Sequence, residues 1–274
     1  MPMIEAIDRT KIHVRDWGPA EARPLVLIHG WPLNADSWEY QAVRLAEAGH
    51  RVVAYDRRGF GRSEQPFTGY DYDTMSDDLA TVMAALDLEE ATLAGFSMGG
   101  GEVARYMSRH EGERVAKTML ISSVVPFMLD TDDHDGVPQK VFDGIKDGLR
   151  KDRPEFLSEF FKTFYGQGTK KGGVSDGVLH WSLMMAMQAS PKATLDCVDA
   201  FGTTDFRPDL DAFDVPTLVV HGTADETVPI DPSGRAAAEA IRDAELKEYD
   251  GAPHGLTATH ADQLFQDMLE FHES

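Results

Sequence analysis

Leu93-Ala94-Gly95-Phe96-Ser97-Met98-Gly99-Gly100-Gly101 is the stretch that decides the fold of this 274-residue chain. Within it, Gly95 to Gly99 fits the pattern G-x-S-x-G, which places a serine on a sharp turn between a buried strand and a helix. Small residues two positions before and after Ser97 leave room for that turn. The pattern predicts Ser97 as a nucleophile, and the alternative is a strand-to-helix turn without chemistry.

Strand and helix patterns alternate on both sides of this turn. The runs Pro24 to His29 and Ala91 to Phe96 are typical of strands that are covered on both faces. Such alternation predicts an α/β fold, with a mostly parallel central sheet flanked by helices. Further strands are expected over 51–55, 115–121, 217–221 and 246–249, and an antiparallel hairpin at the sheet edge over 4–7 and 11–17.

The alternation stops in the second half of the chain. From about Val124 to Phe213, helical patterns follow one another without strands between them. We therefore expect 1–123 and 214–274 to form one α/β core and 124–213 to form a small helical cap insertion. The carboxyl edge of the sheet is the place that such a layer can cover.

Two local features allow narrower predictions. The loop Asp56 to Ser63 is rich in Gly and Arg, but it lacks the spacing of known phosphate-binding loops. A tight turn pinned by charge pairs is the favoured interpretation. Asp73 or Thr74 is predicted to cap the helix that follows.

Composition limits the partners of the chain. The net charge is −21, with acidic residues spread along the chain, which disfavours nucleic-acid binding. This surface favours solubility, or it is an adaptation to a salty medium. The one cysteine, Cys197, excludes an internal disulfide and is expected in the core. No apolar run reaches the ~18 residues of a membrane helix, and no secretion signal is recognised, so we expect a cytoplasmic protein.

Two residues later in the chain complete a possible catalytic set with Ser97. Serine needs a base to take its proton, and the base needs a partner that orients it. Asp225 follows a predicted strand, and His254 follows the last one. Ligand sites gather at the carboxyl ends of parallel strands, so all three side chains are expected at one edge. Taken singly, Asp225 could be a turn former and His254 a structural residue, but their order with Ser97 predicts a triad.

An acyl-transfer site also needs donors for the oxyanion. The backbone N–H of Met98, directly after the nucleophile, is one expected donor. Trp31 lies in the loop after an early central strand, so its N–H is the second candidate. His29 could act as another base, but we interpret it as a support for this loop.

Three stretches resemble the cofactor-free haloperoxidase and aryl esterase branch of the α/β-hydrolase fold. The resemblance implies a serine esterase for small acyl or aryl esters that works without cofactor, metal or haem. It also implies perhydrolysis, in which hydrogen peroxide replaces water and yields a peracid that can oxidise halide. Members are often trimers or hexamers, so a homo-oligomer is expected, with no membrane partner. The stretches are Gly95 to Tyr106, Pro216 to Gly222 and Gly251 to Leu256, and the similarity runs nearly end to end, including 141–144 and 200–208.

The resemblance also suggests a substrate pocket. Pro32 restricts the backbone of Trp31, and members with strong perhydrolase character tend to carry proline there. Pro32 is therefore expected to favour peroxide, although it could simply stiffen the loop. Alternatives to the esterase are a lactonase or γ-lactamase with the same triad, and a small-molecule receptor. The residues expected to line the pocket are Trp31, Pro32, Met98, Phe127, Phe142, Phe201 and Val228.

Overall fold

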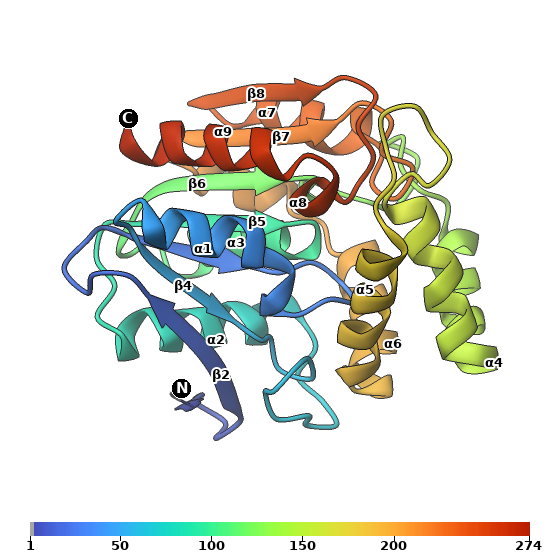
Figure 1. The fold of residues 1–274 in the computed structure, drawn as a ribbon, viewed down its shortest axis with the longest axis horizontal. Coiled ribbons are helices and arrows are strands. Elements are labelled where there is room, and N and C mark those ends of the chain that lie inside the picture. The colour runs from blue at the N-terminus through green and yellow to red at the C-terminus, as the bar shows by residue number, and fades with distance from the viewer. Residues whose placement is uncertain (1–2) are drawn as a thin grey trace.

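A single eight-stranded sheet runs through the centre of the protein, whose computed structural model describes residues 3–274 (Figure 1). The strand order is β1-β2-β4-β3-β5-β6-β7-β8. Strands β1 and β2 are antiparallel to their neighbours at one edge, and the remaining pairs are parallel. The strands are β1 (Met3–Glu5), β2 (Lys11–Trp17), β3 (Pro24–Ile28), β4 (Arg51–Tyr55), β5 (Ala91–Phe96), β6 (Val115–Ile121), β7 (Thr217–Gly222) and β8 (Ala244–Tyr249).

Helices cover both faces of this sheet. α1 and α9 pack together on one face, whereas α2 and α3 pack together on the other (Figure 1). Every side chain of the central strands β3, β5 and β7 is buried, as the apolar runs predicted. The helices are α1 (Glu39–Glu47), α2 (Tyr72–Ala85), α3 (Met98–Arg109), α4 (Gln139–Phe164), α5 (Asp176–Gln188), α6 (Pro191–Thr203), α7 (Ala236–Ala240), α8 (Leu256–Thr259) and α9 (Ala261–Glu273).

The chain between β6 and β7 contains α4, α5 and α6 and no strand of the sheet. These three helices stand beyond the carboxyl ends of the strands (Figure 1). α4 bends at Asp152, whose φ of −159° and ψ of 88° are not helical. Pro154 follows two residues later, and proline both lacks an N–H and disfavours the helical conformation of the residue before it. The bend brings two apolar stripes of one helix over the same edge of the sheet.

The loop between β4 and α2 is pinned by charge pairs, which confirms the structural interpretation of its arginines. Arg58 donates to the buried carboxylate of Asp78 from Nε at 2.6 Å and Nη2 at 2.7 Å. Arg62 donates from Nε to Asp56 at 2.7 Å. Because these guanidinium groups are already paired with carboxylates of the protein, the loop is a structural turn.

Two local predictions were wrong. The cap of α2 is Asp71, whose Oδ1 accepts from the Thr74 N–H at 2.9 Å, rather than Asp73 or Thr74. The helix therefore begins two or three residues earlier, because Tyr72 is drawn into the core beside Phe206. The first strand ends at Glu5, and Ile7 lies in the turn with 83% of its surface exposed.

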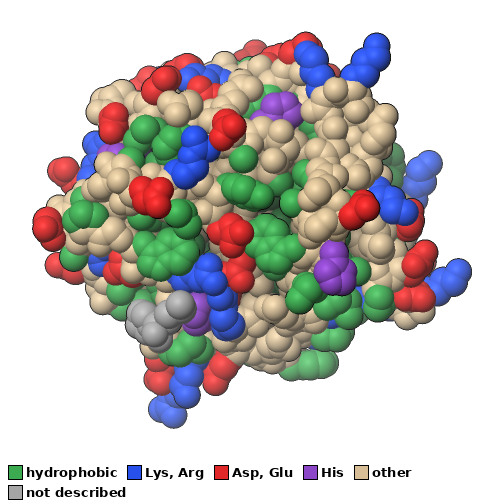
Figure 2. All heavy atoms as spheres, in the orientation of Figure 1, with side chains coloured by type: hydrophobic (Ala, Val, Ile, Leu, Met, Phe, Trp, Pro, Cys, Tyr) green, Lys and Arg blue, Asp and Glu red, His purple; other side chains and the backbone are tan. Residues whose placement is uncertain are grey.

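The surface charges and the burial of the single cysteine agree with what the composition predicts. Acidic and basic side chains are interspersed over the face shown in Figure 2. Cys197 is fully buried, and burial raises the pKa of its thiol to about 12, as expected of a small core residue. Within residues 3–274, no helix combines the length and the apolar character that crossing a membrane requires.

Candidate active site

Ser97 lies on a strained turn between β5 and α3. Its φ of 55° and ψ of −121° are unusual for a residue with a side chain. The turn is tight enough that a Cβ on Gly95 would lie 2.5 Å from the carbonyl oxygen of Gly99. Glycine at this position therefore permits the close approach of strand and helix, and the turn presents Ser97 at the carboxyl edge of the sheet.

Two further side chains complete a hydrogen-bonded chain with this serine. His254, in the loop after β8, places its Nε2 2.9 Å from Ser97 Oγ. Its Nδ1 lies 2.7 Å from Oδ2 of Asp225, in the loop after β7. A carboxylate can only accept, so Nδ1 carries the proton of the neutral ring and Nε2 is free to accept from the serine hydroxyl. The structure thus brings together the three residues predicted as a triad.

The surroundings of Asp225 keep its carboxylate ionised. Burial raises its pKa, but the charge of His254 and hydrogen bonds from His221 and His254 lower that pKa well below its usual range. The other oxygen, Oδ1, accepts from the backbone N–H groups of Thr227 at 2.9 Å and Val228 at 2.8 Å. The Asp225 carboxylate is therefore fixed in place and negatively charged at neutral pH.

The loop after β3 lies directly against Ser97. A Cβ on Gly30 would lie 2.9 Å from Ser97 Cβ, so Trp31 begins beside the serine. Met98 is the first residue of α3, where backbone N–H groups have no partner within the helix. Among residues 3–274, neither the Met98 nor the Trp31 N–H donates a hydrogen bond outside regular secondary structure. Both groups are available to a ligand.

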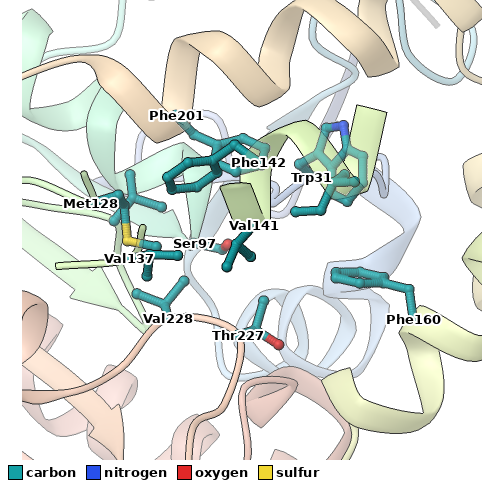
Figure 3. A pocket seen from close by; sticks show the side chains of 12 residues that line it. Trp31, Ser97, Met128, Val137, Val141, Phe142, Phe160, Phe201, Thr227 and Val228 are labelled. Atoms are coloured by element: carbon teal, nitrogen blue, oxygen red, sulfur yellow. The ribbon is translucent and has the colours of Figure 1, made fainter. Parts of the chain in front are cut away.

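An apolar pocket opens above Ser97 (Figure 3). The cavity within it has a volume of about 50 Å³. Residues of α4 and α6 form much of its wall, so the helices between β6 and β7 complete the site. The lining residues are Trp31, Ser97, Val124, Met128, Val137, Val141, Phe142, Ile145, Phe160, Phe201, Thr227 and Val228.

A buried ion pair supports the loop that carries Trp31. The Arg57 guanidinium bonds the Glu102 carboxylate of α3, and both side chains are at most 1% exposed. Arg57 also donates from Nη2 to the His29 carbonyl at 2.7 Å, and its N–H donates to His29 Nε2 at 3.0 Å. Burial and the charge of Arg57 lower the pKa of His29 to about 3, so this ring stays neutral. His29 is thus the loop support that the sequence suggested.

Comparison with known proteins identifies the family. The chain matches the family model described as alpha/beta hydrolase fold over residues 23–261, most of its length. This chain belongs to the α/β-hydrolase family.

Relatives of this α/β hydrolase share nearly its whole length. It is 47% identical over 262 residues to a putative non-heme chloroperoxidase of Synechocystis sp., covering 95% of this chain and 94% of that one. It is 40% identical to a bifunctional esterase/perhydrolase of Acinetobacter calcoaceticus, covering 99% of both. A bromoperoxidase crystal structure from Bacillus anthracis superposes with a TM-score of 0.94 at 44% identity, covering 100% of this chain and 99% of that one.

Some predicted pocket residues of this α/β hydrolase lie elsewhere. Trp31, Phe142, Phe201 and Val228 line the pocket, whereas Pro32, Met98 and Phe127 do not. The Phe127 ring lies 5.3 Å from the His134 ring and 5.1 Å from the Arg207 guanidinium carbon. Pro32 is buried within its loop, and the Met98 side chain is buried at the start of α3. The direction of these side chains depends on tertiary packing that no sequence pattern encodes.

The sequence reasoning also missed several residues of the site. Ile145 and Phe160 carry a visible signal in the sequence, because Ile145 lies three residues after Phe142 and Phe160 lies four residues before Phe164, as apolar residues of one helical face do. His221 lies near the end of β7, with its Nε2 3.3 Å from Asp225 Oδ2 and 2.9 Å from the Val228 carbonyl oxygen. Its position four residues before Asp225 is the sequence signal that could have indicated this contact. Val141 opens the stretch 141–144 that belongs to the resemblance, whereas no signal pointed to Val124, Met128, Val137 and Thr227. Within residues 3–274, no cluster of three or more His, Cys, Asp or Glu side chains could hold a metal ion.

Proposed function

We propose that this α/β hydrolase cleaves small carboxylic esters through an acyl-enzyme on Ser97, and that hydrogen peroxide can replace water in the second step. The observation that carries the proposal is the Ser97–His254–Asp225 hydrogen-bonded chain at the floor of an apolar pocket. The name of the Acinetobacter relative, an esterase/perhydrolase, supports both activities.

In the acylation step His254 acts as the base. As Ser97 Oγ attacks the ester carbonyl carbon, its proton moves to His254 Nε2, and the Asp225 carboxylate stabilises the resulting imidazolium. The N–H groups of Met98 and Trp31 donate to the developing oxyanion, and losing one such donor typically costs ~10²–10³ in rate. The alkoxide leaves with the proton from His254, and the acyl group remains on Ser97.

In the second step a small nucleophile releases the acyl group. Water or hydrogen peroxide gives a proton to His254 Nε2 while its oxygen bonds the acyl carbon. The bond from that carbon to Ser97 Oγ then breaks, and Ser97 takes the proton back from His254. Water yields the carboxylic acid and peroxide yields the peracid, so neither reaction requires a redox cofactor.

The shape of the pocket favours small, apolar acyl groups. Phe142, Phe160 and Phe201 narrow the space around Ser97 (Figure 3). Burial of apolar surface is worth about 25 cal/mol per Å², so acetyl, propionyl and aryl groups gain affinity without a polar partner. We therefore expect activity to fall as the acyl chain outgrows the pocket.

A p-nitrophenyl acetate assay tests the catalytic role of Ser97. We expect continuous release of p-nitrophenolate by the native protein and its loss in Ser97→Ala. A single turnover that leaves Ser97 acetylated would instead identify a receptor. A panel of short esters, lactones and γ-lactams, with and without peroxide, then ranks the substrates.

We also propose that Pro32 favours peroxide over water, because it restricts the backbone of Trp31 beside Ser97. Pro32→Leu should lower the ratio of peracid to acid formed from one acyl donor. An unchanged ratio would leave Pro32 as a residue that stiffens the loop.

We further propose a cytoplasmic protein that assembles as a homotrimer or homohexamer. The single buried cysteine supports a reducing compartment, and the resemblance to a family branch whose members are often trimers or hexamers supports the assembly. Light scattering coupled to gel filtration tests the assembly, since a monomer mass would refute it.

A further inference from the structure

A second histidine contacts the carboxylate that orients His254. His221 of β7 is fully buried, and its Nε2 lies 3.3 Å from Asp225 Oδ2 and 2.9 Å from the carbonyl oxygen of Val228. Oδ2 is also the oxygen that His254 Nδ1 approaches at 2.7 Å. Two imidazole rings therefore share one carboxylate oxygen, and the ring of His254 is the one that contacts Ser97.

The contacts of His221 fix the place of its proton. A carbonyl oxygen and an ionised carboxylate only accept, so Nε2 carries the hydrogen that both neighbours share. On the other side of the ring, Nδ1 is buried and has no hydrogen-bond partner within residues 3–274. Gly234 packs against this side, where a Cβ would lie 2.6 Å from Nδ1. A proton at Nδ1 would be a buried donor without an acceptor, which is costly, so the ring is neutral with its N–H at Nε2.

The N–H of His221 completes the set of donors around Asp225. Oδ1 accepts from the backbone N–H groups of Thr227 and Val228, and Oδ2 accepts from the two histidine rings. Rotation of this carboxylate would break contacts at both oxygens, so the four donors hold Oδ2 toward His254. The Val228 carbonyl accepts from the same His221 N–H, and Val228 lines the pocket. One ring thus fixes the carboxylate and the loop that follows it.

We propose that His221 is a positioning residue for the reaction, which acts through Asp225 and does not touch the substrate, an inference that rests on the proposed function. In both steps His254 takes up a proton at Nε2 and becomes an imidazolium, so the carboxylate must be ionised and correctly oriented at that moment. The His221 N–H donates to Oδ2 and favours the ionised carboxylate over the protonated one. His221 itself neither gives nor takes a proton.

Two variants separate the N–H of His221 from the bulk of its ring. His221→Met fills a similar space without a donor, whereas His221→Gln can bring an amide N–H to the position of Nε2. Turnover of p-nitrophenyl acetate is measured per active site, with sites counted by labelling Ser97 with a fluorophosphonate. We expect His221→Met to lower kcat roughly tenfold, as for loss of one hydrogen bond to a charged group, with a smaller change in KM. His221→Gln should restore most of kcat.

A double-mutant cycle with Asp225→Asn tests whether His221 acts through this carboxylate. Asparagine keeps the shape of the side chain but not its negative charge, so in that background His221→Met should change kcat by less than about twofold. An effect of the ring on the fold alone would lower kcat by the same factor in both backgrounds. Equal factors would therefore overturn the inference, as would native kcat in His221→Met or the same loss in both His221 variants.

Thr217→Val is the matched control, because it removes a buried polar contact at the other end of the same strand. The Thr217 hydroxyl oxygen lies 2.7 Å from that of Thr118. The control should lower the melting temperature and keep the native kcat per labelled site. A tenfold loss of kcat in the control would assign the His221 effect to destabilisation and refute the inference. Steady turnover by the native protein does not depend on this outcome, whereas native protein without turnover refutes the proposed function as well.

Discussion

Replacing Glu102 with glutamine tests the buried ion pair beneath the active site. The Glu102 side chain is 0% exposed and that of Arg57 is 1% exposed, so neither charge is solvated. Glu102 Oε2 also accepts from the Tyr55 hydroxyl at 2.6 Å. Glutamine keeps the shape of the side chain but leaves the Arg57 charge without a counter-ion. Removing one partner of such a pair costs about 3–5 kcal/mol of unfolding free energy.

Urea unfolding followed by circular dichroism measures this loss directly. For a chain of this size each kcal/mol lowers the melting temperature by about 2–4 °C, so the variant should melt roughly 6–20 °C lower. Turnover of p-nitrophenyl acetate should fall as well, because Arg57 also holds the His29 carbonyl beside Trp31. Glu159→Gln is the matched control, since Glu159 pairs with Lys162 on the exposed face of α4 and its loss should leave stability nearly unchanged.

The result that would refute this reasoning is a loss below about 1 kcal/mol, the range of a surface pair. Burial raises the pKa of Glu102, while Arg57 opposes that rise. A small loss would mean that burial prevails and Glu102 is protonated in the folded protein. In that case Glu102→Gln would exchange a neutral carboxylic acid for a neutral amide of the same shape.

Three further changes have defined outcomes. Asp225→Asn should lower kcat on the order of 10⁴-fold with little change in the melting temperature, because the amide no longer favours the proton on His254 Nδ1; a kcat loss below tenfold would exclude Asp225 from this role. The pKa of His29 is about 3 in the folded protein and 6.5 in the unfolded chain, so between these pH values only the unfolded chain binds this proton. As the pH is lowered through this range, the free energy of unfolding should therefore fall by about 1.4 kcal/mol per pH unit. His29→Gln should lack this contribution, so the difference in stability between native protein and variant should change with pH over that range, and parallel curves would contradict the assignment. If the acidic surface is adapted to salt, the melting temperature should rise steadily with potassium chloride, whereas a flat or falling response removes that interpretation.

The predictions from sequence succeeded where local patterns carry a strong physical constraint. β5 begins and ends where its largely apolar run does, at Ala91 and Phe96, because a strand covered on both faces consists mostly of apolar side chains. Ser97, Asp225 and His254 were found because parallel strands deliver their following residues to one edge. The predicted cap of α2 failed by two residues, since Asp71 and Asp73 are equally good caps in isolation and the burial of Tyr72 decides between them.

The sequence alone determined the α/β sheet, the sharp turn at Ser97 and the order of the three residues that meet there. These features depend on short-range patterns of apolar and small residues. Only the tertiary structure decided which side chains enter the pocket, because that depends on how α4 bends at Asp152 and how α6 packs beside it. It placed Phe127 outside the pocket, against His134 and Arg207.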